Sequence, residues 1–214
     1  MKFVSNAGQE RVIDLLRAAL TTSPQLDVLS PSYSLFAYAE LMVDADQTKQ
    51  ARLIIPPTPA IEATQTSQDA LPPLLGNPAD RSARNRLQTR WLARRFAQWL
   101  STRAEVRQSR SAIPQAALVL RDAQGTPVQA LQGSFGFTTD GLGLTPGNPL
   151  NLIYASESAP EATLLSQWFD QQWTNLQAQP DAKATLLAEL NALASHQAPE
   201  HVYATILHHV FQQN

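Results

Sequence analysis

Short strand-like runs alternate with helical segments along the first half of the chain. Leu26–Ser30, Ala51–Pro56 and Ala104–Gln108 each predict a strand, because apolar residues gather there in runs too short for a helix. Over about Gln9–Thr21 and Tyr33–Val43, apolar residues recur every three to four positions, which predicts two amphipathic helices. This alternation predicts βαβ units and a parallel sheet.

Two longer helices carry all four tryptophans of the chain. One is predicted to begin at Asn77 or Asp80 and to end near Thr102. Its apolar side comprises Leu87, Trp91, Leu92, Phe96, Trp99 and Leu100. The other runs from Pro160 to about Leu176, with a core face of Leu164, Leu165, Trp168, Phe169 and Trp173. Because each set lies on one helical face, we expect these aromatic residues to pack in the core.

The middle of the chain predicts a β-pair. The runs Ala116–Leu120 and Val128–Leu131 are separated by a turn at Asp122–Pro127, and a further strand is expected at Asn151–Ala155. The proline-rich stretch Pro57–Pro78 predicts a connecting loop.

After Pro180 the pattern becomes purely helical. Two amphipathic helices are predicted, at about Asp181–Ser195 and Pro199–Gln212. We therefore expect a domain over residues 1–178 and a helical extension over residues 179–214 that leads to a domain not in this chain.

Composition narrows the classes of protein that this chain can belong to. Its 214 residues are 43% hydrophobic, which suffices for one domain with a real core. No apolar run approaches the roughly 20 residues of a membrane span, and the N-terminus lacks the apolar core of a signal peptide. The absence of cysteine excludes disulfides, thiolate metal sites and cysteine nucleophiles. We expect a cytoplasmic protein that does not bind a membrane.

Charge is distributed unevenly although the net charge is only −2. Residues 81–110 contain nine arginines and one acidic residue, Glu105. Arg86, Arg90 and Arg94 recur every four residues and so share one side of the predicted helix. Such clustering is typical of proteins that contact phosphates, and the alternative is a solvated helix face balanced by acidic neighbours.

A glycine-rich segment follows the β-pair and reads Gly133-Ser134-Phe135-Gly136-Phe137-Thr138-Thr139-Asp140-Gly141-Leu142. Together with the strand that begins near Gln115, it resembles the second half of a phospholipase D-like nuclease domain. In that family a His-x-Lys strand leads into a Gly-Ser-x-Asn-x-Thr-x-x-Gly-Leu loop. The resemblance covers about residues 1–178 and implies an α/β fold with a mixed sheet flanked by helices.

The same resemblance implies that the reactive groups of the family are replaced. Gln115 stands where the nucleophilic His is expected, Ala117 where the Lys is expected and Gly136 where the Asn is expected. Asp122 lies at the spacing of the motif's acid, and Ser134 keeps the motif's serine. An amide and a methyl group neither attack phosphorus nor hold its oxygens, and such residues act as a unit. We therefore expect no catalytic residue here.

Binding is the function that remains. The residues expected to bind nucleic acid are Arg84, Arg86, Arg90, Arg94, Arg95, Ser134 and Thr138. For the Gly-Ser loop, the alternative is a turn kept for its backbone geometry alone. The four histidines, at positions 196, 201, 208 and 209, lack the spacing of a metal site. We expect neither a metal nor a cofactor.

Two segments narrow the resemblance further. Arg84–Leu92 and Phe137–Gly143 are similar to degenerate phospholipase D-like domains at the N-terminus of bacterial Swi/Snf-type DEAD/DEAH helicases, often encoded near restriction or phage-defence genes. The implied function is a non-catalytic nucleic-acid-binding or regulatory module, with DNA and a downstream helicase domain of the same polypeptide as partners. The alternatives are an interaction scaffold that forms a homodimer and an active phosphodiesterase or nuclease that uses other residues.

Overall fold

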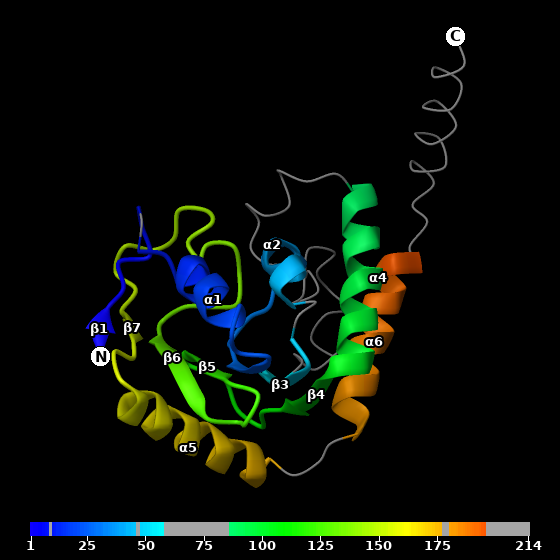
Figure 1. Cartoon of the computed structure of the whole chain (residues 1–214). Coiled ribbons are helices and arrows are strands. Elements are labelled where there is room, and N and C mark those ends of the chain that lie inside the picture. The colour runs from blue at the N-terminus through cyan, green and yellow to red at the C-terminus, as the bar shows by residue number, and fades with distance from the viewer. Residues whose placement is uncertain (9, 46–47, 58–85, 177–179, 196–214) are drawn as a thin grey trace.

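The computed structural model describes residues 1–8, 10–45, 48–57, 86–176 and 180–195. Over these ranges the chain forms a seven-stranded mixed sheet flanked by five helices (Figure 1). The expected α/β class with a mixed sheet and flanking helices is therefore confirmed. None of the helices in these ranges has the length and apolarity required to cross a membrane.

The sheet has the strand order β1-β7-β6-β5-β2-β3-β4. The strands are β1 (Lys2–Phe3), β2 (Gln25–Leu29), β3 (Gln50–Ile55), β4 (Ala104–Gln108), β5 (Ala116–Arg121), β6 (Pro127–Gly133) and β7 (Ile153–Ala155). Strands β2, β3 and β4 are parallel, as the βαβ pattern predicts, whereas the other neighbours in the sheet are antiparallel. The predicted β-pair is the hairpin of β5 and β6. Strand β1 was not predicted, because two residues are too few for a pattern.

The two faces of the sheet are covered unequally. The helices are α1 (Val12–Leu20), α2 (Leu35–Ala45), α4 (Arg86–Arg103), α5 (Ala159–Asn175) and α6 (Pro180–Ser195). Residues of α1, α2, α4 and α6 share one apolar cluster with Leu118 and Leu131 of the sheet. In the described part, α5 alone covers the opposite face, where Phe169 packs with Val119 and Ala130. Helix α6 packs along α4, so this part of the expected extension joins the main core.

Three aromatic or aliphatic side chains expected in the core are partly exposed instead. Trp91 of α4 is 50% exposed, and Leu164 and Trp168 of α5 are 68% and 42% exposed. In the described part, α5 packs on the sheet along one side only. Fewer of its side chains are therefore buried than expected, and Leu165 and Phe169 are among those that are.

Several expectations lie outside the described residues. They are the predicted loop Pro57–Pro78 beyond its first residue, the start of the long helix at Asn77 or Asp80, the second tail helix at residues 199–212 and the four histidines. The side chain of Leu87 also lies outside the description.

A buried tyrosine joins β2 to β3 and makes the stability of the fold sensitive to alkaline pH. The Tyr33 hydroxyl donates to the carbonyl oxygens of Val28 at 3.2 Å and Ile54 at 3.0 Å. Burial raises the pKa of Tyr33 above its ordinary value of 10.0, and a backbone hydrogen bond opposes this effect. The unfolded chain therefore ionises this hydroxyl first, so its contribution to stability is complete below pH 10 and declines above it.

We expect the wild-type protein to lose more unfolding free energy between pH 9 and pH 11 than Tyr33→Phe does. Urea denaturation at several pH values measures both proteins. Equal losses in the two proteins would contradict this assignment, because every other titrating group is common to both.

Candidate functional site

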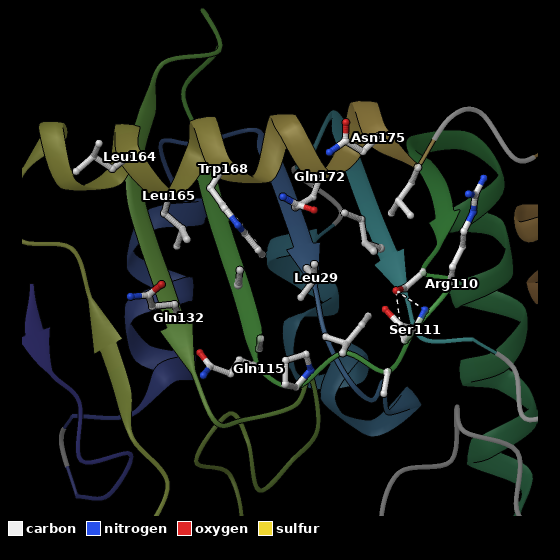
Figure 2. Close-up of a pocket in the computed structure, with 18 of the residues that line it drawn as sticks. Leu29, Arg110, Ser111, Gln115, Gln132, Leu164, Leu165, Trp168, Gln172 and Asn175 are labelled. Carbon is white, nitrogen blue, oxygen red and sulfur yellow. Dashed lines mark hydrogen bonds between the residues drawn. The ribbon is translucent and has the colours of Figure 1, made fainter.

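A cavity of about 600 Å³ lies between α5 and the sheet (Figure 2). Its floor is apolar and includes Leu29 of β2, Ile54 of β3 and Ala117 of β5, all of which are buried. Strand β5 is antiparallel to β2, so it begins where the parallel strands end. The cavity therefore opens at the carboxyl ends of the parallel strands, where ligands usually bind in α/β sheets.

Two segments form the walls of this cavity. The loop that follows β4 is held to β3, because Ser109 N–H donates to the Ile55 carbonyl at 2.8 Å. The Ser109 hydroxyl also donates to the Ser111 carbonyl at 2.7 Å, which closes a tight turn. On the opposite wall, Trp168 and Gln172 are four residues apart on α5 and point from the helix toward the strands (Figure 2).

The two positions that correspond to the His and Lys of the family motif both line this cavity. Gln115 lies just before β5 and is exposed, whereas Ala117 is 3% exposed in the floor. The structure thus brings together the two positions that the motif pairs, and it places a neutral amide and a methyl group there. Neither group is a nucleophile, a general acid or a cation at neutral pH.

The polar lining is mainly neutral. Four amide side chains line the cavity: Gln115, Gln132, Gln172 and Asn175. Within the described residues, Arg110 has the only charged side chain in the lining. The α-amino group of Met1 is also near, but it pairs with Glu161 and, at 3.3 Å, with Glu157. The side chain of Glu161 makes the largest contribution to raising the pKa of this amino group.

The remaining motif residues lie elsewhere. Asp122 stands at the far end of β5, where its carboxylate accepts from Gln124 N–H at 2.9 Å and Thr126 N–H at 2.8 Å. It therefore stabilises the hairpin turn. Ser134 is exposed and Thr138 is buried, and neither lines the cavity.

The Gly-Ser loop packs instead against the segment that follows β2. Phe137 N–H donates to the Ser30 hydroxyl at 2.8 Å and Ser34 N–H donates to the Phe137 carbonyl at 2.9 Å. At Gly136, a Cβ atom would collide with the Ser32 hydroxyl. This close packing favours the alternative that the loop is a turn kept for its backbone geometry, with a role in stabilising the fold.

The arginine cluster is only partly described. Arg94 of α4 is exposed, and Arg90 and Arg95 are half-buried. Arg84 and the side chain of Arg86 lie outside the described residues. Helix α4 packs on the sheet face opposite the cavity, so the structure does not bring Arg90, Arg94 or Arg95 to Gln115 and Ala117.

A network of charges that the sequence did not reveal joins α5 to the sheet. Asp27 of β2 is 3% exposed and accepts from Arg52 at 2.6 and 2.7 Å and from Arg121 at 2.8 Å. Both arginines also donate to Asp170 of α5, at 2.7 and 2.9 Å. Burial lowers the pKa of Arg52, but its hydrogen bonds and ion pairs with the two aspartates outweigh this and hold the pKa above its ordinary value. The signal in the sequence was the single charged residue within each apolar run.

Aromatic rings cover the same network. The Arg52 guanidinium lies 5.1 Å from the ring centre of Phe169 and 5.4 Å from that of Trp173, both on α5. Arg107 of β4 lies 4.3 Å from the ring centre of Trp173 and donates to its carbonyl oxygen. These contacts hold the carboxyl-terminal half of α5, and with it Gln172, at a fixed height above the strands.

No protein-family model and no curated protein matches the sequence. Among solved structures, the chain is similar to the crystal structure of polyphosphate kinase from Porphyromonas gingivalis, with a TM-score of 0.46 and 9% sequence identity. The likeness covers 78% of this chain and 24% of that protein, so this chain spans about a quarter of its length. Among the described residues, no group of three or more His, Cys, Asp or Glu side chains is placed to hold a metal ion.

Proposed function

We propose that this chain is a non-catalytic module that binds nucleic acid on a phospholipase D-like frame. The observation that carries the proposal is the cavity at the end of the parallel strands. It contains both positions that the motif reserves for reacting groups, and Gln115 and Ala117 occupy them. The lining keeps the capacity to form hydrogen bonds while lacking, in the described part, a histidine, a lysine or a carboxylate.

Arginines supply the affinity in this proposal. Arg94 on α4 and Arg110 at the cavity are exposed, and both belong to the basic segment of residues 81–110. Contacts of this kind bind the phosphate backbone with little regard to base sequence. Binding through phosphates releases counterions, so the affinity falls steeply as the salt concentration rises.

A titration at two salt concentrations tests nucleic-acid binding. We expect labelled single-stranded or duplex DNA to bind at ~50 mM salt and to bind much more weakly at ~200 mM. Arg94→Gln and Arg110→Gln should each reduce the slope of log affinity against log salt by about 1. Arg11→Gln is the matched control, because Arg11 is committed to Asp14 through bonds of 2.8 Å. Failure to bind either DNA at ~50 mM salt would refute the proposal.

The helicase context is a finer proposal that rests on motif resemblance. In it, the module presents DNA to a Swi/Snf-type motor of the same polypeptide in a restriction or phage-defence system. The segments Arg84–Leu92 and Phe137–Gly143 support it. The reading frame downstream of Asn214 tests it, since a helicase core encoded there is the expected result and any other domain would contradict it.

Dimerisation is a second candidate function, favoured by one surface. Phe3 of β1 is 51% exposed, and Leu150 and Leu152 before β7 are 84% and 55% exposed, so apolar side chains gather near one edge of the sheet. Such side chains favour contact with another protein. Light scattering distinguishes a dimer from a monomer.

A further inference from the structure

We infer that the cavity beneath α5 binds an unpaired nucleobase. The inference rests on the proposed nucleic-acid binding and names the part of the ligand that this site takes. The shape of the cavity, its hydrogen-bonding groups and its charge all suit a planar, neutral base that is attached to a phosphate.

The amide groups are the first observation. The side chains of Gln115, Gln172 and Asn175 line the cavity from two separate segments, and within the described residues they form no hydrogen bond to the protein. An amide offers a donor and an acceptor side by side, which is the pattern on the edge of a base. Gln and Asn pair with adenine in this way. The free amides therefore match a neutral ligand that both donates and accepts.

Trp168 and the apolar floor are the second observation. Trp168 is 42% exposed, and its side chain points toward the strands (Figure 2), above a floor that contains Leu29 and Ala117. Planar bases stack on such rings, and stacking tolerates every base. A phosphate group suits this floor poorly, because an apolar surface gives its charge no compensation.

Charge around the cavity orients the ligand. Arg110 is exposed beside Ser111 at the end of the cavity opposite Gln132 (Figure 2). Its guanidinium suits a phosphate attached to a base that lies farther in. The cavity volume of about 600 Å³ is within the range of small-ligand pockets. A nucleotide with its base under α5 and its phosphate near Arg110 satisfies all three observations.

The base can come from a nucleic-acid strand or from a free nucleotide. Fluorescence anisotropy with a labelled dA oligonucleotide, the same oligonucleotide made of abasic residues, and adenosine monophosphate as a competitor distinguishes these sources. The variants are Trp168→Ala and Gln172→Leu. Their matched controls on the same helix are Gln167→Ala and Gln171→Leu, at exposed positions that do not line the cavity.

We expect Trp168→Ala to weaken binding of the base-containing oligonucleotide at least about 5-fold and to leave abasic binding unchanged. Gln172→Leu should act in the same direction, and the two controls should not. Equal binding of both oligonucleotides by the wild type, or no effect of either variant, overturns the inference while nucleic-acid binding itself stands. Binding of the mononucleotide alone, lost in Trp168→Ala, supports the inference and rejects the proposed module. Binding of neither ligand rejects both.

Discussion

Replacing Asp27 with alanine is expected to lower the free energy of unfolding by about 3–5 kcal/mol. Asp27 is buried between Arg52 and Arg121, whose side chains are only 20% and 11% exposed. Removing the carboxylate leaves two guanidinium groups that share one carboxylate, Asp170, in a setting that water reaches poorly. The cost of an uncompensated buried charge makes this effect much larger than that of a surface ion pair. Urea denaturation followed by circular dichroism measures it.

Two carboxylates provide controls for this prediction. Asp170 accepts from the same arginines but is 43% exposed, so Asp170→Ala should cost less than Asp27→Ala. Asp14 pairs with Arg11 on the surface of α1, and Asp14→Ala should cost less than about 1 kcal/mol. Equal losses for Asp27→Ala and Asp14→Ala would mean that the network does not stabilise the fold.

The network also connects stability to the candidate site. Asp170 lies between Trp168 and Gln172 on α5, so the contacts that fix this helix also fix the two cavity side chains. Asp170→Ala, the milder change, is therefore expected to weaken ligand binding because Trp168 and Gln172 are no longer held in place. Asp170 does not itself line the cavity.

Replacing Gly133 with alanine is the second change for which we expect a large loss, at least about 2 kcal/mol of unfolding free energy. Gly133 ends β6 with φ at +151°, which L-residues rarely adopt. A Cβ atom there would collide with the Leu152 carbonyl oxygen and lie 2.8 Å from Ile153 Cα. Since both atoms belong to the backbone beside β7, the strands must separate to relieve the contact.

Gly125→Ala separates the steric effect from the backbone effect. Gly125 has φ at +84° in the hairpin turn, but its Cβ atom would meet only the Gln25 side chain at 3.9 Å. This variant should therefore lose only the roughly 1–2 kcal/mol of a left-handed residue. Thermal or urea unfolding of both variants tests the difference. If Gly133→Ala loses no more unfolding free energy than Gly125→Ala, the separation of β6 from β7 does not destabilise the fold and the prediction is wrong.

Gly133 and Phe137 show that packing alone places strong requirements on the Gly-Ser loop. Position 133 requires glycine because two strands approach closely there. Phe137 of the same segment connects the loop to Ser30 through a hydrogen bond. Neither requirement involves Gln115 or Ala117. The packing of this loop therefore does not depend on which side chains occupy positions 115 and 117.

Much of the secondary structure could be predicted from local pattern. The strand at Ala104–Gln108 has the predicted bounds, and α5 begins within one residue of the predicted Pro160. Periodicity suffices in these cases because each element has one apolar side and a clear boundary residue. It predicts which side faces inward, but it contains no information on how many layers will cover that side. Trp91, Leu164 and Trp168 were placed in the core for this reason.

The sequence by itself determined most of the order of elements, the parallel start of the sheet and its antiparallel hairpin. It also showed that Gln115 and Ala117 stand where the motif that the chain resembles has His and Lys. Only the tertiary structure decided that these positions face a cavity, that Trp168 and Gln172 overhang it, and that Asp27 gathers two arginines. The physical reason is separation along the chain. Local periodicity follows from backbone geometry within a few residues, whereas Asp27, Arg121 and Asp170 meet only after the strands have paired and α5 has crossed them.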